Sequence, residues 1–268
     1  MLPRLINSIP NSEIIVIDDG STDNTKQVCS QYSVRVISHP YSQGNGAAIK
    51  TGARAANGNI LVFMDADGQH DPNAILELIK KLDEGFDLVV GARDGKSQAN
   101  IGRSIANLFY NRLASYMTGQ TIQDLTSGFR AVRANQFREF LYLLPNGFSY
   151  PTTVTMAFFR AGYPVAYVPI TTSARIGKSH IHILKDGLRF LLIIFKIGTL
   201  YSPLKLFFPV ALTHATLGLG YYAYSFVTEG RLSIATIFLL TAAITIFLIG
   251  LVSEQITQLM YKASEKEK

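Results

Sequence analysis

The sequence is poor in charged residues and nearly free of cysteine. Charged residues make up 16% of the 268 residues, a low share for a soluble protein. The single cysteine, Cys29, excludes an internal disulfide framework and fits a reducing compartment. Residues 1–10 lack the apolar core of a signal peptide, so we expect no secretory leader. The sequence also shows no internal repeat and no low-complexity tract.

The length and the net charge limit the classes of protein and partner. A chain of 268 residues can form one large domain, or a domain with an appendage. Lys and Arg number 25 against 19 Asp and Glu, which gives a net charge of +6. This modest excess fits an anionic partner, either nucleotide phosphates or an acidic membrane surface, and it does not choose between them.

The stretch NILVFMDADGQHDP at residues 59–72, the acidic motif, begins with a short apolar run at residues 60–64 that is typical of a buried strand. Asp65, Asp67 and Gln69 come directly after that strand, where open α/β sheets bind ligands. Two carboxylates so close repel each other, and a hard cation such as Mg²⁺ or Mn²⁺ relieves the repulsion. The alternative is an acidic turn that only caps the helix expected near Pro72.

A second apolar run, EIIVIDD at residues 13–19, also ends in paired carboxylates. The loop after it offers Ser21, Thr22 or Asp23 as the N-cap of a helix. Strands and helices then alternate, with a helix to about residue 32, a strand at 34–38, helices at 47–56 and 73–84, and a strand at 88–91. This alternation predicts an α/β fold with a doubly wound, mainly parallel sheet.

The glycine-bearing segment GNGAAIK opens one of the expected helices. It has neither the spacing of a P-loop nor that of a dinucleotide fingerprint. The simpler interpretation is that its glycines allow a loop-to-helix turn. Its backbone amides could instead face a phosphate, as amides at helix N-termini often do.

Basic residues recur after the first hundred residues. A helix expected at residues 100–113 carries Arg103 and Arg112, and polar loops follow at residues 124–130 and 175–180. Arg and Lys in glycine- or serine-bearing loops suit phosphate oxygens. Ordinary surface charge is the alternative for any single residue, but three such sites on one chain favour a phosphate-rich site.

The C-terminal part predicts a membrane hairpin. Residues 206–227 and 232–252 contain no charged residue, and each is long enough to cross a hydrocarbon core, which needs about 20 residues. Several Lys and Arg residues flank the hairpin on its outer sides, whereas Arg231 is the only one in the link. The positive-inside bias therefore predicts that the globular domain and the C-terminus are cytoplasmic. A buried hairpin of a soluble protein is the alternative.

A different helix is expected at residues 181–204. Lys185, Arg189 and Lys196 fall in one narrow stripe of this helix, which suits the membrane interface, although a plain packing helix is also compatible. The predicted organisation is a catalytic domain, this interfacial helix, two transmembrane helices and a cytoplasmic tail, with boundaries at 1–180, 181–204, 205–253 and 254–268.

Four motifs in this order, IDDGSTDNT, GNGAAIKTG, FMDADGQHDP and DLTSGFRAVR, resemble inverting family 2 glycosyltransferases with a GT-A fold. The last motif, together with residues 175–179 and the two C-terminal spans, is similar to the polyprenyl-phosphate glycosyltransferase branch, which includes dolichyl-phosphate mannose synthases. The resemblance covers residues 13–179.

This resemblance implies roles for particular side chains. Asp18 and Asp19 would contact the donor nucleotide. Asp65, Asp67 and Gln69 would hold Mg²⁺ or Mn²⁺ and the donor diphosphate. The residues implied to bind acceptor or donor phosphates are Arg103, Ser127, Arg130, Arg175 and Lys178. Asp67 and Arg130 are the implied catalytic residues.

The implied reaction moves a hexose from a nucleotide-sugar, of the GDP-mannose or UDP-glucose type, to dolichyl or undecaprenyl phosphate with inversion. A metal neutralises the charge that grows on the departing diphosphate. The acceptor phosphate, with a second pKa of about 6, is largely ionised at neutral pH. No histidine base is needed, and His70 is expected to be a loop residue. No nucleic-acid partner is expected, and a homo-oligomer is compatible with the sequence.

Two alternatives compete with this reaction. Processive polysaccharide synthases usually carry a Gln-x-x-Arg-Trp motif, and the sequence has no Trp. A non-catalytic membrane subunit is the other alternative. Family members usually begin with a strand ending in a Pro-x-Tyr-Asn-Glu segment, whereas this sequence starts in what resembles the helix after that strand. We therefore expect weakened donor binding for the chain as written.

Overall fold

The computed structural model describes most of the chain, as two compact units, Met1–Phe190 and Leu191–Lys268. The described residues are 1–93, 101–147, 149–171, 192, 195, 198–199 and 202–266, with only the backbone for 101–107 and 260–266. The predicted interfacial helix therefore lies almost entirely outside the described residues.

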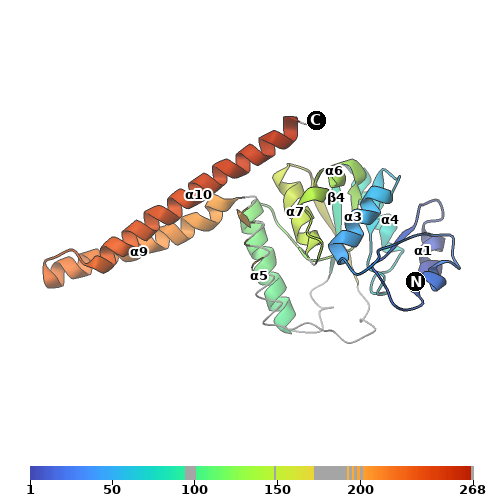
Figure 1. The fold of residues 1–268 in the computed structure, drawn as a ribbon, viewed down its shortest axis with the longest axis horizontal. Coiled ribbons are helices and arrows are strands. Elements are labelled where there is room, and N and C mark those ends of the chain that lie inside the picture. Colours follow the sequence, from blue (N-terminus) through green and yellow to red (C-terminus); the bar gives the residue numbers. More distant parts are fainter. Residues whose placement is uncertain are drawn as a thin grey trace. The chain divides into compact units, whose positions relative to one another are not determined.

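The first unit alternates helices and strands (Figure 1). Its helices are α1 (Leu2–Ser8), α2 (Thr25–Cys29), α3 (Asn45–Ala55), α4 (Ala74–Asp83), α5 (Ile101–Thr118), α6 (Ala134–Glu139), the 3-10 helix η2 (Leu141–Leu143) and α7 (Tyr150–Arg160). Its strands are β1 (Ile15–Asp18), β2 (Arg35–Ser38), β3 (Ile60–Phe63), β4 (Leu88–Arg93), β5 (Arg130–Arg133) and β6 (Val165–Ile170).

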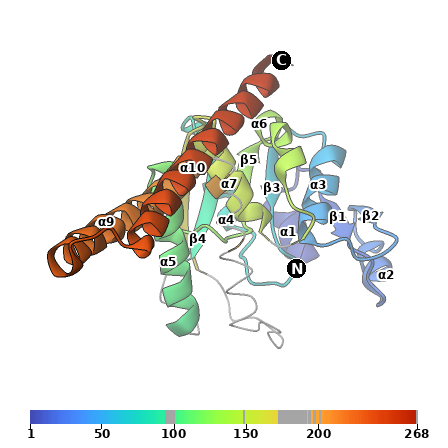
Figure 2. The same ribbon diagram turned by 60° about the vertical axis from the view of Figure 1, so that its left-hand side comes forward.

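The described strands form two sheets rather than one (Figure 2). β1 and β2 pair in parallel. The larger sheet has the order β3-β5-β4-β6, in which β5 runs antiparallel to β3 and β4, while β4 and β6 are parallel. The α/β class is as predicted, but the large sheet is mixed. The sequence analysis missed β5 because an arginine at each end of this short strand hides its apolar pattern.

Helices cover both faces of the large sheet. On one face, Ile75 and Leu78 of α4 pack with Val89 of β4 and Ala131 of β5, and Leu5 of α1 contacts the same cluster. On the other face, aromatic rings of β3, α6 and α7 pack together. Because residues of a strand alternate between faces, β5 sends Ala131 to the first face and Arg130 towards α7.

Two predicted helix starts need correction. The N-cap of α2 is Asn24, and Asp23 instead accepts the Thr25 amide at 3.0 Å. Helix α4 begins at Ala74 with Asn73 as its N-cap, so Pro72 precedes the helix rather than opening it.

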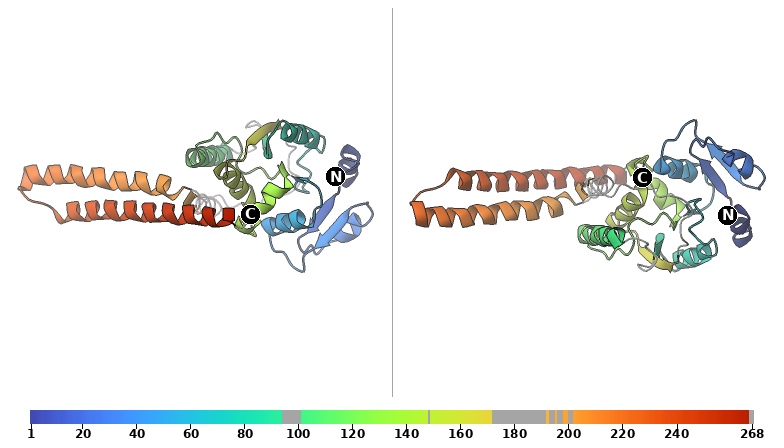
Figure 3. Two further views of the ribbon diagram at one scale, coloured as in Figure 1. Left: turned by 90° about the horizontal axis from the view of Figure 1, so that it is seen from above. Right: turned by 90° about the horizontal axis from the view of Figure 1, so that it is seen from below.

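The second unit is a hairpin of two long helices, α9 (Pro203–Glu229) and α10 (Ile234–Lys266), which lie side by side (Figure 3). Glycines permit the close packing, since a Cβ at Gly250 would lie 2.6 Å from the Phe207 Cβ. Among the described helices, one segment is long and apolar enough to cross a membrane, Ile234–Leu259 of α10, with a mean hydropathy of 2.6 and 17% of it buried. The other predicted span lies within α9.

Candidate active site

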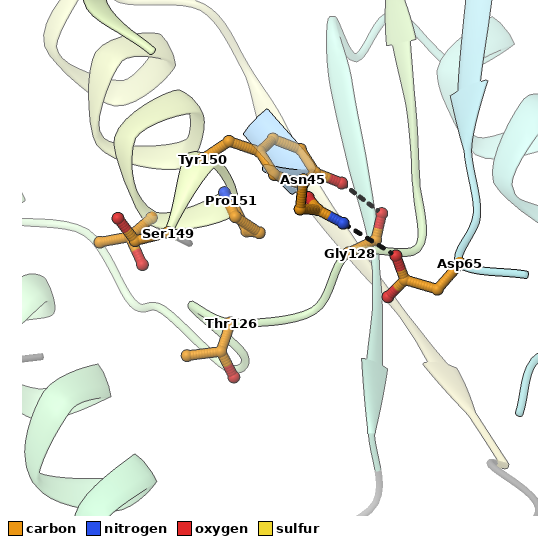
Figure 4. A pocket seen from close by; sticks show the side chains of 8 residues that line it. Asn45, Asp65, Thr126, Gly128, Ser149, Tyr150 and Pro151 are labelled. Atoms are coloured by element: carbon orange, nitrogen blue, oxygen red, sulfur yellow. Dashed lines mark hydrogen bonds between the residues drawn. The ribbon is translucent and has the colours of Figure 1, made fainter. Parts of the chain in front are cut away.

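A pocket opens beyond the carboxyl end of β3, where three predicted motifs meet (Figure 4). Its lining residues are Asn45, Asp65, Thr126, Gly128, Ser149, Tyr150, Pro151 and Thr152. Asn45 comes from the glycine-bearing segment, Asp65 from the acidic motif, and Thr126 and Gly128 from the loop before β5. The start of α7 forms the remaining wall, and the sequence analysis did not single it out.

The Asp65 carboxylate lies against the backbone of Gly128. A Cβ at Gly128 would stand 3.1 Å from Asp65 Oδ2, so a larger residue would press on the carboxylate. The Tyr150 hydroxyl donates to the Gly128 carbonyl at 2.9 Å, and Asn45 Nδ2 donates to Asp65 Oδ1 at 3.5 Å (Figure 4). Burial raises the pKa of Tyr150, which keeps its hydroxyl protonated as a donor. These contacts fix the acidic motif to the pocket wall.

The oxygen atoms of Asp65, Asp67 and Gln69 suit a hard divalent cation. The side chains of Asp65 and Asp67 form no ion pair with any described residue. Asp67 Oδ1 accepts a hydrogen bond from the backbone amide of Gln69, at 3.1 Å. No group of three or more His, Cys, Asp or Glu side chains with metal-site geometry occurs in the described part of the chain. The side-chain oxygen of Gln69 would therefore have to be the third metal ligand beside Asp65 and Asp67. Two carboxylates and one amide oxygen have the donor chemistry of a Mg²⁺ or Mn²⁺ site, and the metal set itself stays a prediction.

Asp19 holds the loop before α3. Its carboxylate accepts four hydrogen bonds, from His39 Nδ1 at 2.7 Å, the Ser42 hydroxyl at 2.8 Å and the amides of Gln43 and Gly44 at 2.9 and 2.8 Å. Burial acts to raise the pKa of Asp19, but these hydrogen bonds outweigh it and hold the pKa far below its usual range. Asp19 is thus already engaged by the protein.

Asp18 is the more available of the two predicted donor-binding carboxylates. Its Oδ1 accepts the Ser21 amide at 3.0 Å, whereas its buried Oδ2 has no hydrogen-bond partner among the described residues. Hydrogen bonds from Ser21 hold the pKa of Asp18 below its usual value, so the side chain is a carboxylate. An unsatisfied buried acceptor favours a ligand donor at this position.

Two of the amides that open α3, those of Gly46 and Ala47, already donate to carbonyls of the protein, which favours the structural interpretation of the GNG segment. The Gly46 amide donates to the Gly147 carbonyl at 3.2 Å, and the Ala47 amide donates to the Asn146 carbonyl at 2.8 Å. A Cβ at Gly46 would lie 2.0 Å from the Pro145 carbonyl oxygen. Glycine is therefore required here for the close approach of two backbones.

The same contact sets the start of α7. Lys50 Nζ donates to the Leu144 carbonyl at 3.2 Å and to the Asn146 side chain. Three residues later, Ser149 takes a left-handed conformation with φ 92° and becomes the N-cap of α7. A non-glycine residue in this conformation is strained by roughly 1–3 kcal/mol, and such strain occurs mainly at functional sites. The pocket wall is thus built by anchoring 144–147 to α3.

Arg130 lies under the pocket and is fully buried. Its guanidinium donates to the Pro151 carbonyl at 3.1 Å, to the Thr155 hydroxyl at 3.3 Å and to the Ser127 carbonyl. Among the described residues no carboxylate forms an ion pair with it, and burial lowers its pKa. This geometry joins the loop before β5 to α7, and places a buried guanidinium beside the pocket wall, over the Tyr150 ring at 5.6 Å.

Arg93 is a site residue that the sequence analysis missed. Its guanidinium forms a two-pronged contact with Asp124, at 2.8 and 2.9 Å, and donates to the Thr126 hydroxyl at 2.5 Å. Asp124 also accepts the amides of Thr126 and Ser127, at 3.0 and 3.1 Å. The pair therefore shapes the loop that carries Thr126 into the pocket. The strand was expected to end before Arg93, so nothing in the sequence pointed to this residue.

We expect Arg93→Ala to lower the free energy of unfolding by about 3 kcal/mol, because it leaves the buried Asp124 carboxylate without its cation. Arg93→Leu combined with Asp124→Asn should recover part of that loss, which a double-mutant cycle measures by chemical unfolding. The control is Arg4→Ala, which removes an exposed pair with Asp71 at 3.4 Å and should cost at most about 1 kcal/mol. Equal losses for Arg93→Ala and Arg4→Ala would contradict the role of the buried pair.

Acid should destabilise the catalytic unit through its carboxylates. Burial raises the pKa of Asp124, but the hydrogen bonds and charge of Arg93 lower it more, and Asp18 and Asp19 are shifted in the same net direction. Groups with lowered pKa values stabilise the fold above their unfolded pKa of about 3.9, and this contribution is lost as the pH falls through the lower folded values. We therefore expect the thermal midpoint to fall steeply below about pH 4, and less steeply in Asp19→Asn. Identical slopes in both proteins would contradict this assignment.

The remaining predicted site residues are placed as follows. Ser127 is buried in the loop before β5. His70 lies in the loop after β3, as expected, and is buried there, stacked on the Phe129 ring with the ring centroids 4.8 Å apart. Burial lowers the pKa of His70 although Asp65 and Asp67 act to raise it. Arg103 lies in α5 with its side chain outside the described residues, and two further predicted phosphate-binding residues, Arg175 and Lys178, lie outside them altogether.

Comparison with known proteins places this site in a family. The model described as Glycosyl transferase family 2 matches residues 1–141, more than half of the chain, and the model described as GtrB C-terminal hairpin matches residues 202–259. The hairpin match and the apolar helix α10 indicate membrane association.

Two relatives and one solved structure illustrate the similarity. The chain is 36% identical to a dolichol-phosphate mannosyltransferase of Pyrococcus furiosus over 165 residues. This matched stretch is 55% of this chain and 45% of the relative, so the chain spans less than half the length of that protein. It is 30% identical to an undecaprenyl-phosphate mannosyltransferase of Micrococcus luteus, over 66% of this chain and 79% of the relative.

The solved structure is glucosyl-3-phosphoglycerate synthase of Mycobacterium tuberculosis in complex with Mn²⁺, UDP-glucose and phosphoglyceric acid. It superposes with a TM-score of 0.58 at 23% identity, over 73% of this chain and 74% of that chain, and at this identity it shows the fold alone. The expected GT-A fold is thereby confirmed. By its family match, its fold and its pocket, the chain belongs to glycosyl transferase family 2 and is a glycosyltransferase.

Proposed function

We propose that the protein transfers a hexose from a nucleotide-sugar to a polyprenyl phosphate with inversion at the anomeric carbon. The observation that supports this proposal most is the combination of two features in one chain. One is a pocket bordered by Asp65 and the loop before β5, and the other is the apolar hairpin that follows in the sequence. The named relatives that act on dolichyl or undecaprenyl phosphate support the lipid acceptor. GDP-mannose and UDP-glucose types remain the proposed donors.

The donor would be held at the carboxyl ends of β1 and β3. Asp65, Asp67 and Gln69 would bind a divalent cation and the donor diphosphate, and Asp18 would accept a hydrogen bond from the nucleotide through its unsatisfied Oδ2. The cation, when bound, stabilises the negative charge of the leaving diphosphate. Because the protein already engages both oxygens of Asp19, we propose that Asp19 shapes the nucleotide loop.

The acceptor phosphate would react without a strong base from the protein. A phosphate monoester is largely ionised near neutral pH, and its oxygen can attack the anomeric carbon from the face opposite the diphosphate. The buried charge of Arg130 would stabilise anionic groups above it, because charges interact strongly where water is excluded. The proposed direct phosphate contacts are Arg103, Ser127, Arg175 and Lys178, with the catalytic unit and the C-terminus on the cytoplasmic side.

The proposal is tested by incubating membranes that contain the full chain with labelled GDP-mannose or UDP-glucose. Each donor is supplied with polyprenyl phosphate or with the matching polyprenol, and each reaction is run with Mg²⁺ or with a chelator. We expect label in the lipid fraction only with the phosphorylated acceptor and the metal. Equal labelling of the alcohol would contradict the proposed acceptor, and labelling that survives the chelator would contradict the metal site.

A further inference from the structure

The N-terminal end of α7 forms one side of the pocket. Ser149, Tyr150, Pro151 and Thr152, which are the N-cap and the first three residues of α7, all line it (Figure 4). Helix α7 has 11 residues, so the aligned peptide dipoles give this end a partial positive charge. The Asp65 carboxylate lies across the pocket from Ser149 in Figure 4. The pocket is therefore electropositive on the α7 side and acidic on the other.

The first turn of α7 has amide donors that the described protein does not use. Ser149 is the N-cap, but its hydroxyl makes no capping hydrogen bond. A serine N-cap usually accepts the amide of the third helical residue, here Thr152. The amide of Thr153 donates to the Ser149 carbonyl at 3.3 Å, whereas those of Tyr150 and Thr152 have no partner among the described residues.

The hydroxyl of Thr152 is a second, independent indication of a ligand. Thr152 lines the pocket and is fully buried, yet its Oγ1 has no hydrogen-bond partner among the described residues. The nearby threonine hydroxyls are both used, since Thr153 donates to the Ser149 carbonyl at 3.4 Å and Thr155 to the Pro151 carbonyl at 2.9 Å. A buried hydroxyl without a partner is unfavourable for folding, so its place at a pocket wall favours a partner supplied by a ligand.

We propose that the N-terminal end of α7 binds the phosphate monoester of the lipid acceptor, with the Thr152 hydroxyl and the amides of Tyr150 and Thr152 as donors. Free amides at a helix N-terminus suit a phosphate, because each amide donates a hydrogen bond and the helix dipole favours negative charge. That the phosphate belongs to a lipid acceptor rests on the proposed function.

The donor diphosphate fits this end of the pocket less well. Asp65 repels a phosphate unless a cation lies between them, and the diphosphate is the group proposed to bind together with that cation. The acceptor phosphate needs hydrogen-bond donors instead, which α7 supplies. An acceptor phosphate at α7 and a diphosphate at Asp65 would lie on two sides of the pocket, as direct displacement with inversion requires.

The binding of a short acceptor tests this subsite without turnover. Farnesyl phosphate, farnesol, and GDP or UDP with Mn²⁺ are each titrated into the full chain in detergent, and their dissociation constants are measured by calorimetry. Thr152→Val removes the hydroxyl at nearly constant shape. It should weaken the binding of farnesyl phosphate about tenfold, the effect of losing one hydrogen bond to a charged group. The affinities for farnesol and for the nucleotides should be unchanged.

Two further variants serve as controls for Thr152→Val. Thr152→Ser keeps a hydroxyl at the pocket and should bind farnesyl phosphate like the wild type. Thr153→Val removes the neighbouring hydroxyl, which already donates to the Ser149 carbonyl, and should also bind like the wild type. Thr152→Ala is the second variant if Thr152→Val folds poorly, and it should show the same tenfold loss.

Thermal unfolding without ligand separates binding from a structural role. Because the Thr152 hydroxyl has no described partner, Thr152→Val should keep or raise the thermal midpoint. A clearly lowered midpoint, or unchanged affinity for farnesyl phosphate, would overturn the proposal. Weaker binding of the nucleotides alone would assign α7 to the donor and would also overturn it. Tenfold weaker binding of farnesyl phosphate in Thr152→Val would support the subsite even if the wild type transferred no sugar, so the two failures are distinguishable.

Discussion

Asp67→Asn is expected to reduce sugar transfer by about 10²–10³-fold, because a neutral amide replaces one of two carboxylates proposed to hold the cation. Folding should be nearly unchanged. Asp67 is half-buried and accepts a hydrogen bond from the backbone amide of Gln69 at 3.1 Å. The side-chain oxygen of an asparagine can accept the same hydrogen bond. Transfer kinetics over a range of Mn²⁺ concentrations measure the effect, which should include a weaker apparent affinity for the metal.

The control for this variant lies in the same motif. Asp71 is a carboxylate whose side chain is 49% exposed and pairs with Arg4 on the surface. Asp71→Asn should leave transfer and its metal dependence close to wild type. Full activity of Asp67→Asn, or an equal loss in Asp71→Asn, would contradict the assignment of Asp67.

Gly46→Ala should have the largest effect on the architecture of the site. Its Cβ would stand 2.0 Å from the Pro145 carbonyl oxygen and 2.9 Å from that of Gly147, so the backbone of 145–147 would have to move away from α3. Overpacking of this kind lowers the free energy of unfolding by about 1–3 kcal/mol. We expect a loss at the upper end of this range, because the atoms that the Cβ would meet belong to the backbone and cannot rotate away as a side chain can. Because 145–147 leads into α7, transfer activity should fall together with the thermal midpoint.

A glycine in the same helix provides the control. A Cβ at Gly52 would meet Ile17 Cγ1 at 3.5 Å, which is an ordinary contact. Gly52→Ala should therefore be neutral or stabilising by up to about 1 kcal/mol, through the better helix propensity of alanine. If Gly46→Ala were as stable and active as Gly52→Ala, the anchoring of 145–147 to α3 could not shape the pocket.

The acidic motif shows how much of the site could be predicted from the sequence. An apolar run that ends in two carboxylates predicts a strand with ligands at its end, and β3 followed by Asp65 at the pocket confirms that part. The predicted metal set remains a prediction. Local patterns were sufficient here because the strand and its acidic end are adjacent in sequence.

The other walls of the pocket depend on pairs of residues far apart in sequence. Arg93 and Asp124 are 31 residues apart, and Lys50 and Asn146 are 96 apart. Neither pairing leaves a periodic signal that one sequence can show. The GNG segment has the same property, since its glycines are explained by the carbonyls of a distant loop rather than by a local turn alone. Likewise, only the structure shows that Arg130 is buried beneath the pocket.

The most direct test of the central claim is mass spectrometry of the lipid fraction after the purified full chain is incubated with nucleotide-sugar, polyprenyl phosphate and Mn²⁺. The account predicts a polyprenyl phosphate that has gained one hexose, together with the free nucleoside diphosphate, and almost none of this product with Asp67→Asn. Absence of any hexose-bearing lipid with every donor tested, or its formation in equal amounts by Asp67→Asn, would contradict the account.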